Sequence, residues 1–162
     1  MNETYTEQLI KRKTPMKEKL LLGVLIFITF LLLIYGVMNP VFMIAAIILI
    51  VIDVIWFRSM NVEYEYLFIN GSLDIDKIMS KSRRKHIFEM DMSELEIMAP
   101  EGNPELRQYQ GLKKNDYSSG MLGSKAYEMI IIKNGAKKKI VFEPKENIVE
   151  GMWMKAPRKV VK

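Results

Sequence analysis

The chain has 162 residues, of which 49% are hydrophobic and 27% are charged, and its formal net charge is +5. The absence of cysteine excludes a disulfide framework and a thiolate metal centre, and with a single histidine any metal would be held mainly by oxygen ligands. The modest basic excess fits a position close to anionic lipid and gives no reason to expect a nucleic-acid partner.

Residues 1–19 form a basic N-terminal segment ahead of the first apolar run. We expect this segment to lie outside the folded domain that follows. Its basic residues are Lys11, Arg12, Lys13, Lys17 and Lys19.

Residues 20–57 predict two membrane-spanning helices. Residues 20–37 carry no charge, and residues 41–57 carry only Asp53. At 1.5 Å per residue each run is roughly 25 to 27 Å long, close to the thickness of a bilayer core. Between them, Asn39 is a good helix N-cap and Pro40 a good first helical residue. The sequence therefore predicts a transmembrane helical hairpin.

Basic residues indicate how this hairpin is oriented. Five precede the first span, Arg58 follows the second, and the connecting turn has none. The positive-inside bias then predicts a multi-pass protein of the cell membrane with both termini in the cytoplasm. A cleaved signal peptide is disfavoured because a second span follows directly and no A-x-A site is present. A buried hairpin of a soluble protein is disfavoured because the remaining polar residues could not easily cover both helices.

Asp53 is an ionisable residue inside the second span, which makes it a functional candidate. A structural role is the preferred interpretation. It lies one turn from the end of the predicted span, where we expect it to reach water, Lys17 or Lys19.

Residues 58–162 predict a cytoplasmic β domain. Alternating apolar residues over 62–69, an Asn70-Gly71 turn and residues 72–79 predict a hairpin, and a basic loop at 80–85 follows it. Short strands are expected at 86–90 and 95–99, then a long loop over 100–123 with a weak strand at 106–112. A second hairpin is expected at 127–133 and 138–142 around Asn134-Gly135. An amphipathic helix over 144–156 completes an α+β fold.

This order resembles the pleckstrin-homology-like (PH-like) domains of bacteria, in which a bent antiparallel sheet is plugged by a final helix. Together with the two spans, the chain resembles a family of small bacterial membrane proteins that carry a domain of unknown function. The resemblance implies the PH-like fold and brings no activity with it. The residues that carry it are Glu63 to Tyr66, Asn70-Gly71, Asp74 to Ile78, Arg83 to Lys85, Asp116 to Gly120, and Phe142 to Pro144.

Two charged groups are candidates for an interaction surface. One is an acidic sheet face, which could hold a cation, meet a basic protein partner, or be neutralised by nearby basic residues. The other is the basic loop, which could contact anionic headgroups or simply be solvated. His86 has no recognisable nucleophile or carboxylate motif to make it a general base. The candidate residues are Glu63, Glu65, Asp74, Asp76, Lys81, Arg83, Arg84 and Lys85.

The leading hypothesis is a membrane-anchored, non-catalytic interaction or scaffold module with a membrane or envelope protein as its partner. The alternative is a small accessory or regulatory subunit of a larger membrane complex, with Gly23, Gly36, Ala45 and Ala46 allowing close contacts through the spans. An enzyme acting on lipid or envelope substrates is the least favoured. We expect no catalytic, cofactor or metal site.

Overall fold

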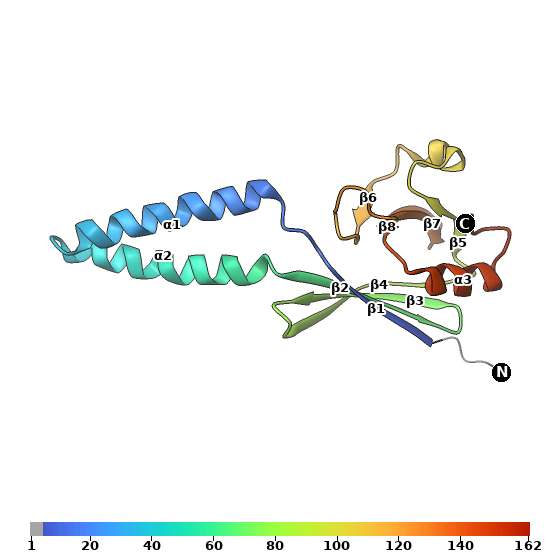
Figure 1. The fold of residues 1–162 in the computed structure, drawn as a ribbon, viewed down its shortest axis with the longest axis horizontal. Coiled ribbons are helices and arrows are strands. Elements are labelled where there is room, and N and C mark those ends of the chain that lie inside the picture. The colour runs from blue at the N-terminus through green and yellow to red at the C-terminus, as the bar shows by residue number, and fades with distance from the viewer. Residues whose placement is uncertain (1–4) are drawn as a thin grey trace. The chain divides into compact units, whose positions relative to one another are not determined.

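A computed structural model describes residues 5–162, which form two compact units. One unit is a helical hairpin that runs through Thr14–Val62 and includes residues Met79–Arg83. The other is a β domain built from residues 5–13 together with Glu63–Ile78 and Arg84–Lys162. The two units are described separately below, and Figure 1 labels their elements.

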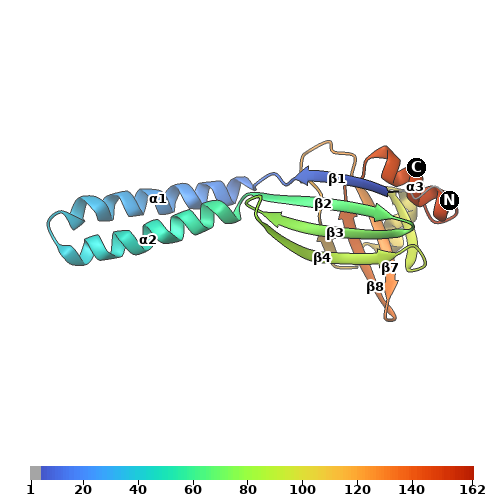
Figure 2. The ribbon, with the colours of Figure 1, turned by 90° about the horizontal axis from the view of Figure 1, so that it is seen from below.

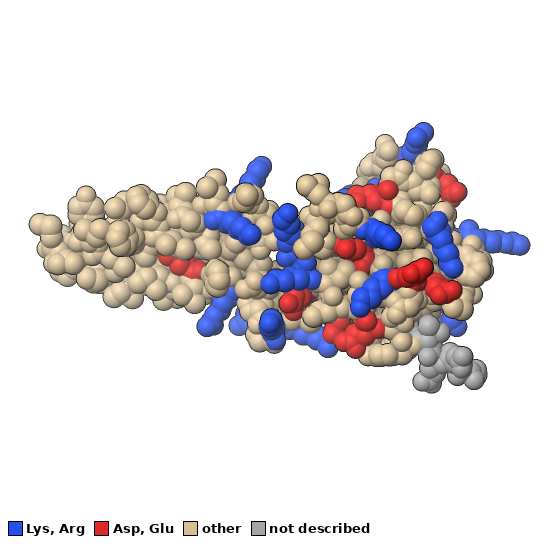
Figure 3. All heavy atoms as spheres, in the orientation of Figure 1, with Lys and Arg blue, Asp and Glu red and all other residues tan. Residues whose placement is uncertain are grey.

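The hairpin consists of α1 (Met16–Gly36) and α2 (Pro40–Ser59), so each helix is slightly longer than the predicted span. The Asn39 side chain accepts a hydrogen bond from the Val41 amide at 3.0 Å, and Pro40 occupies the first turn, as predicted. Both helices are long and apolar enough to cross a membrane. Only 17% and 6% of their apolar windows are buried inside the protein, and uncharged side chains cover most of the hairpin surface visible in Figure 3. These properties fit a membrane-anchored protein.

The two helices approach closely at a glycine. Gly36 is buried, and a Cβ atom built on it would lie 2.9 Å from the backbone of Met43. Ala46 is also fully buried against the neighbouring helix. Small side chains thus allow α1 and α2 to pack against each other. Gly36 and Ala46, two of the four small residues expected to contact other proteins, are therefore occupied within the hairpin.

The lysine partners expected for Asp53 are wrong. The hydroxyl of Thr29 lies 2.8 Å from Asp53 Oδ2, and Thr29 is itself buried. The register explains the difference. Gly36 faces Met43, and in this register Thr29 of α1 lies at the level of Asp53. Lys19 precedes Thr29 by ten residues, which is about 15 Å by helix rise.

The first sheet of the β domain has the strand order β1-β2-β3-β4 (Figure 2). Its strands are β1 (Tyr5–Lys11), β2 (Val62–Ile69), β3 (Ser72–Met79) and β4 (Arg83–Asp91). The β2–β3 turn is confirmed: Asn70 and Gly71 both have positive φ, at 52° and 101°. β1 corrects the expected boundaries, because residues 5–11 of the presumed N-terminal segment pair antiparallel with β2 from Tyr5↔Ile69 to Lys11↔Glu63. The hairpin is therefore inserted between two paired strands of the domain.

The basic loop is shorter than predicted. Only residues 80–82 form the turn, and β4 already begins at Arg83. Charge alone suggested a loop, but β4 continues through these residues, and Arg84 forms ion pairs with Glu65 and Asp76 across the sheet.

The second sheet has the order β5-β7-β8-β6, with β5 (Leu95–Pro100), β6 (Lys114–Asp116), β7 (Tyr127–Lys133) and β8 (Ala136–Phe142). The β7–β8 hairpin around Asn134-Gly135 is confirmed. The weak strand expected over 106–112 is wrong: Pro104–Tyr109 forms a 3-10 helix, η1, which Asn103 caps through its side chain. β6 lies within the predicted loop and pairs parallel to β8.

A C-terminal helix completes the domain. α3 (Glu146–Lys155) is slightly shorter than the predicted 144–156 and buries Ile148, Val149 and Met152. Beyond it, Val160 forms a parallel bridge with Met98 of β5. The largest fully buried side chains of the domain come from both sheets and include Tyr66, Phe68, Leu73, Ile75, Met98, Ile130 and Phe142.

Candidate functional site

The acidic and basic candidates meet on the outer face of the first sheet. The Arg84 guanidinium forms ion pairs with Glu65 and with Asp76, and His86 Nδ1 lies 2.9 Å from Asp76 Oδ1. Like charges on neighbouring strands repel, and a cation between them removes that repulsion. Of the three explanations considered for the acidic face, neutralisation by a nearby basic residue is therefore built into the fold.

The other candidates divide into two groups. Glu63 is half-buried in β2, opposite Lys11 of β1. Lys81 and Arg83 are exposed and form no ion pair within residues 5–162. Lys85 lines a separate cleft, described below.

Asp74, His86 and Glu89 form the only group of potential metal ligands in the described part of the chain, with ligand atoms within 4.8 Å of one another. Burial, followed by the charges of Glu89 and Asp76, raises the pKa of Asp74, and His86 opposes this rise. One imidazole and two carboxylates could contribute to a metal site. The imidazole also lies between Asp76 and Glu89, with its ring nitrogens 2.9 and 3.9 Å from their carboxylate oxygens.

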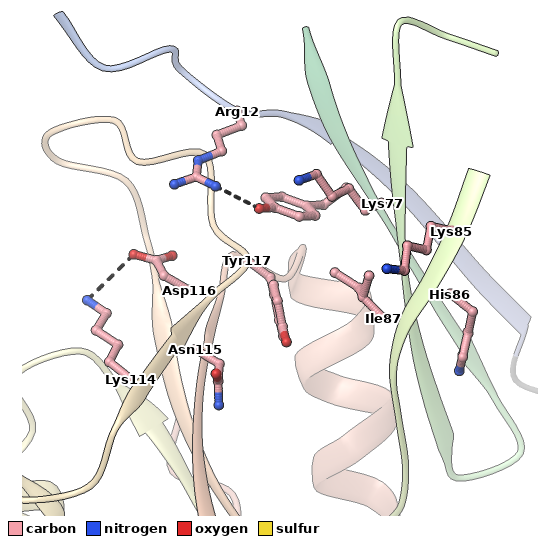
Figure 4. Close-up of a pocket in the computed structure, with 10 residues that line it drawn as sticks. Arg12, Lys77, Lys85, His86, Ile87, Lys114, Asn115, Asp116 and Tyr117 are labelled. Atoms are coloured by element: carbon pink, nitrogen blue, oxygen red, sulfur yellow. Dashed lines mark hydrogen bonds and ion pairs between the residues drawn. The ribbon is translucent and has the colours of Figure 1, made fainter. Parts of the chain in front are cut away.

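A cleft of about 560 Å³ opens between the two sheets of the β domain (Figure 4). Its walls come from segments that are far apart in the sequence. They include Arg12 after β1, the end of β3, the start of β4, and β6 with Tyr117 after it. The cleft is within the size range of small-molecule sites. Its lining residues are Arg12, Tyr64, Lys77, Lys85, His86, Ile87, Lys114, Asn115, Asp116 and Tyr117.

The charge of the cleft is strongly positive, with four Lys or Arg side chains and one carboxylate. Lys77 and Lys85 form no ion pair with any residue from 5 to 162, whereas Lys114 lies 2.9 Å from Glu101 and 3.8 Å from Asp116. Burial favours the neutral amine of Lys114, but the hydrogen bond to Glu101 and the nearby acidic charges outweigh it and raise its pKa. The cleft therefore keeps cations that an anionic group can reach.

Aromatic rings contribute part of the cleft wall. Tyr64 and Tyr117 make an edge-to-face contact with their centroids 5.7 Å apart, and Phe88 supports Tyr117 from 6.1 Å. Arg12 donates a hydrogen bond to the Tyr64 hydroxyl at 3.0 Å. Burial raises the pKa of Tyr117, which keeps its hydroxyl neutral. The wall is thus neutral and aromatic beside its cations.

The cleft lining combines basic, aromatic and amide side chains with one carboxylate and one imidazole. None of the lining residues is a serine, threonine or cysteine, so the cleft walls lack those nucleophiles. Figure 4 shows the His86 ring directed away from the side of the cleft where Asp116 and Asn115 lie.

Sequence reasoning identified Lys85 and missed most of the cleft. Arg12, Lys77, Lys114 and Tyr117 were not candidates, since they come from four segments with no shared motif. The period-two pattern of β3 placed Lys77 on the same face as Tyr64, which is the one signal that could have suggested this site.

The α+β domain consists of two four-stranded sheets and a C-terminal helix, with a basic cleft between the sheets, and this layout fits the expected PH-like class. The family described as "Bacterial PH-like domain (DUF6106)" matches residues 2–162, and the chain belongs to this family. The match includes both apolar helices and the N-terminal strand, and the function of the domain is unknown. Comparison with curated proteins and with solved structures found no match.

Proposed function

We propose that this protein is a membrane-anchored, non-catalytic interaction module. In this proposal, α1 and α2 cross the cell membrane with both termini in the cytoplasm, and the PH-like domain binds an acidic segment of another membrane or envelope protein. The orientation is supported by the five basic residues before the first span and by Arg58 after the second.

The observation that carries this proposal is the unneutralised charge of the cleft. On the outer face of the first sheet, Arg84 already pairs with Glu65 and Asp76. In the cleft, Lys77 and Lys85 have no acidic partner among the described residues. Cations gathered around a hollow repel one another, so a carboxylate-bearing segment stabilises them when it binds.

The alternative, an accessory subunit that contacts a complex through its spans, has less support. Gly36 and Ala46 are buried within the hairpin, so they cannot also form an intermolecular contact. Gly23 is open, with no atom within 4 Å of the position its Cβ would take. Replacing both spans with an unrelated hairpin separates the two proposals, because the interaction module should keep its partner and an accessory subunit should lose it.

Site-specific photocrosslinking in intact cells tests the role of the cleft. A photoreactive residue at Asn115, on the cleft wall, should crosslink to a membrane or envelope protein, and Lys77→Glu with Lys85→Glu should abolish the product. Arg107→Glu with Lys138→Glu is the matched control, because it makes the same charge change at two exposed residues outside the cleft.

Two results would contradict the proposal. One is a crosslink that survives charge reversal in the cleft as well as it survives the control. The other is a product that contains only lipid, which would assign the cleft to anionic headgroups. Binding to an acidic segment should also weaken as salt is raised, because the attraction is screened.

A further inference from the structure

The segment between β6 and β7 carries two exposed apolar side chains. Leu122 is 99% exposed and Met121 is 54% exposed. Gly120 and Gly123 flank them with positive φ, at 67° and 81°, so the chain turns sharply on either side. We refer to Met121 and Leu122 as the apolar tip. Among the large hydrophobic side chains of the described residues, Leu122 is the most exposed.

Ser118 and Ser119 form the stem that precedes the apolar tip, and hydrogen bonds hold both residues in place. Ser118 and Ser119 are only 6% and 4% exposed. The Ser118 amide and hydroxyl both donate to Asp116 Oδ1, and the Ser119 amide donates to the Glu143 carboxylate at 3.2 Å. The exposure of the tip is therefore a feature of an ordered loop.

The stem is also bonded to the segment that leads into the first span. The Lys13 amide donates to the Ser119 carbonyl oxygen at 2.7 Å. Lys13 is three residues before Met16, where α1 begins, and three residues span at most about 10 Å. The apolar tip follows Ser119 by only two or three residues, so the covalent chain and this hydrogen bond limit how far the tip can lie from the start of α1.

We propose that the apolar tip inserts into the boundary between headgroups and acyl chains of the membrane that α1 and α2 cross. Lys13 and Lys125 are exposed on the tethering segment and on the loop, and cations beside apolar side chains are the combination that binds this region. The tip would add a third contact to the two spans and fix the orientation of the PH-like domain. This inference rests on the membrane anchoring in the proposed function, and it is independent of what the cleft binds.

Because the chain has no cysteine, a single cysteine can report the depth of the tip. Leu122→Cys in the full chain, labelled with an environment-sensitive fluorophore and reconstituted in nanodiscs, should be shielded from aqueous iodide and quenched by brominated lipid. Gln108→Cys, at an exposed position of η1, is the control and should show the reverse. We expect at least a several-fold difference in iodide quenching between the two sites.

Equal iodide quenching at both positions, with no effect of brominated lipid at residue 122, would overturn the inference. A protein that does not enter nanodiscs, or that leaves membranes in alkaline carbonate, would instead refute the anchoring itself. As a second measure, Met121→Ser with Leu122→Ser should lower the fluorescence anisotropy of a label at residue 108, because the domain would rotate more freely on its anchor. Unchanged anisotropy in this variant would also contradict an orienting role.

Discussion

Gln8 of β1 connects the N-terminal strand to the start of the C-terminal helix. Its side chain is 6% exposed; the amide donates to the Glu143 carbonyl oxygen at 2.8 Å, and the amide oxygen accepts from the Lys145 N–H at 2.6 Å. Gln8→Ala leaves both backbone groups without a partner. Because each unsatisfied buried group costs about 1–3 kcal/mol, and water can partly reach this site, we expect the free energy of unfolding to fall by about 2–4 kcal/mol.

Urea unfolding of the full chain in detergent micelles measures this loss. Replacing Trp56 with Phe leaves Trp153, on α3, as the single fluorescence reporter. Gln110→Ala, at an exposed glutamine, is the matched control and should change stability by less than about 0.5 kcal/mol. An equally small effect of Gln8→Ala would refute the reasoning that β1 is an integral strand joined to α3.

Two further predictions concern the hairpin and the acidic face. Gly36→Ala should destabilise the hairpin by about 1–3 kcal/mol, because the new methyl group meets backbone atoms 2.9 Å away. Gly23→Ala is the control and should be neutral, because the space around Gly23 is open. Thermal unfolding of the two variants in detergent measures the difference. The raised pKa of Asp74 means that the folded protein binds the carboxyl proton more tightly than the unfolded chain does. The contribution of the protonated Asp74 to the free energy of unfolding is therefore present at low pH and lost as pH rises through the folded-state pKa. Asp74→Asn should therefore raise the urea midpoint at neutral pH and leave it nearly unchanged below about pH 4, and a pH-independent effect would contradict this assignment.

Local patterns were sufficient for the elements that depend on near neighbours in the chain. The two apolar runs, the cap at Asn39 and the two Asn-Gly turns were all predicted, because helix length, capping and positive φ are properties of a few consecutive residues. The amphipathic C-terminal helix was predicted for the same reason. The α+β class followed from the order of these elements.

Pairings between distant segments depended on the tertiary structure. Residues 5–11 show no decisive strand signal, and they become β1 because β2 offers a partner more than fifty residues away. The contact between Asp53 and Thr29 depends on the register of the hairpin, and the ion pairs of Arg84 depend on strands brought side by side. The basic cleft arises where separate segments meet, so the sequence holds its residues without indicating that they belong together.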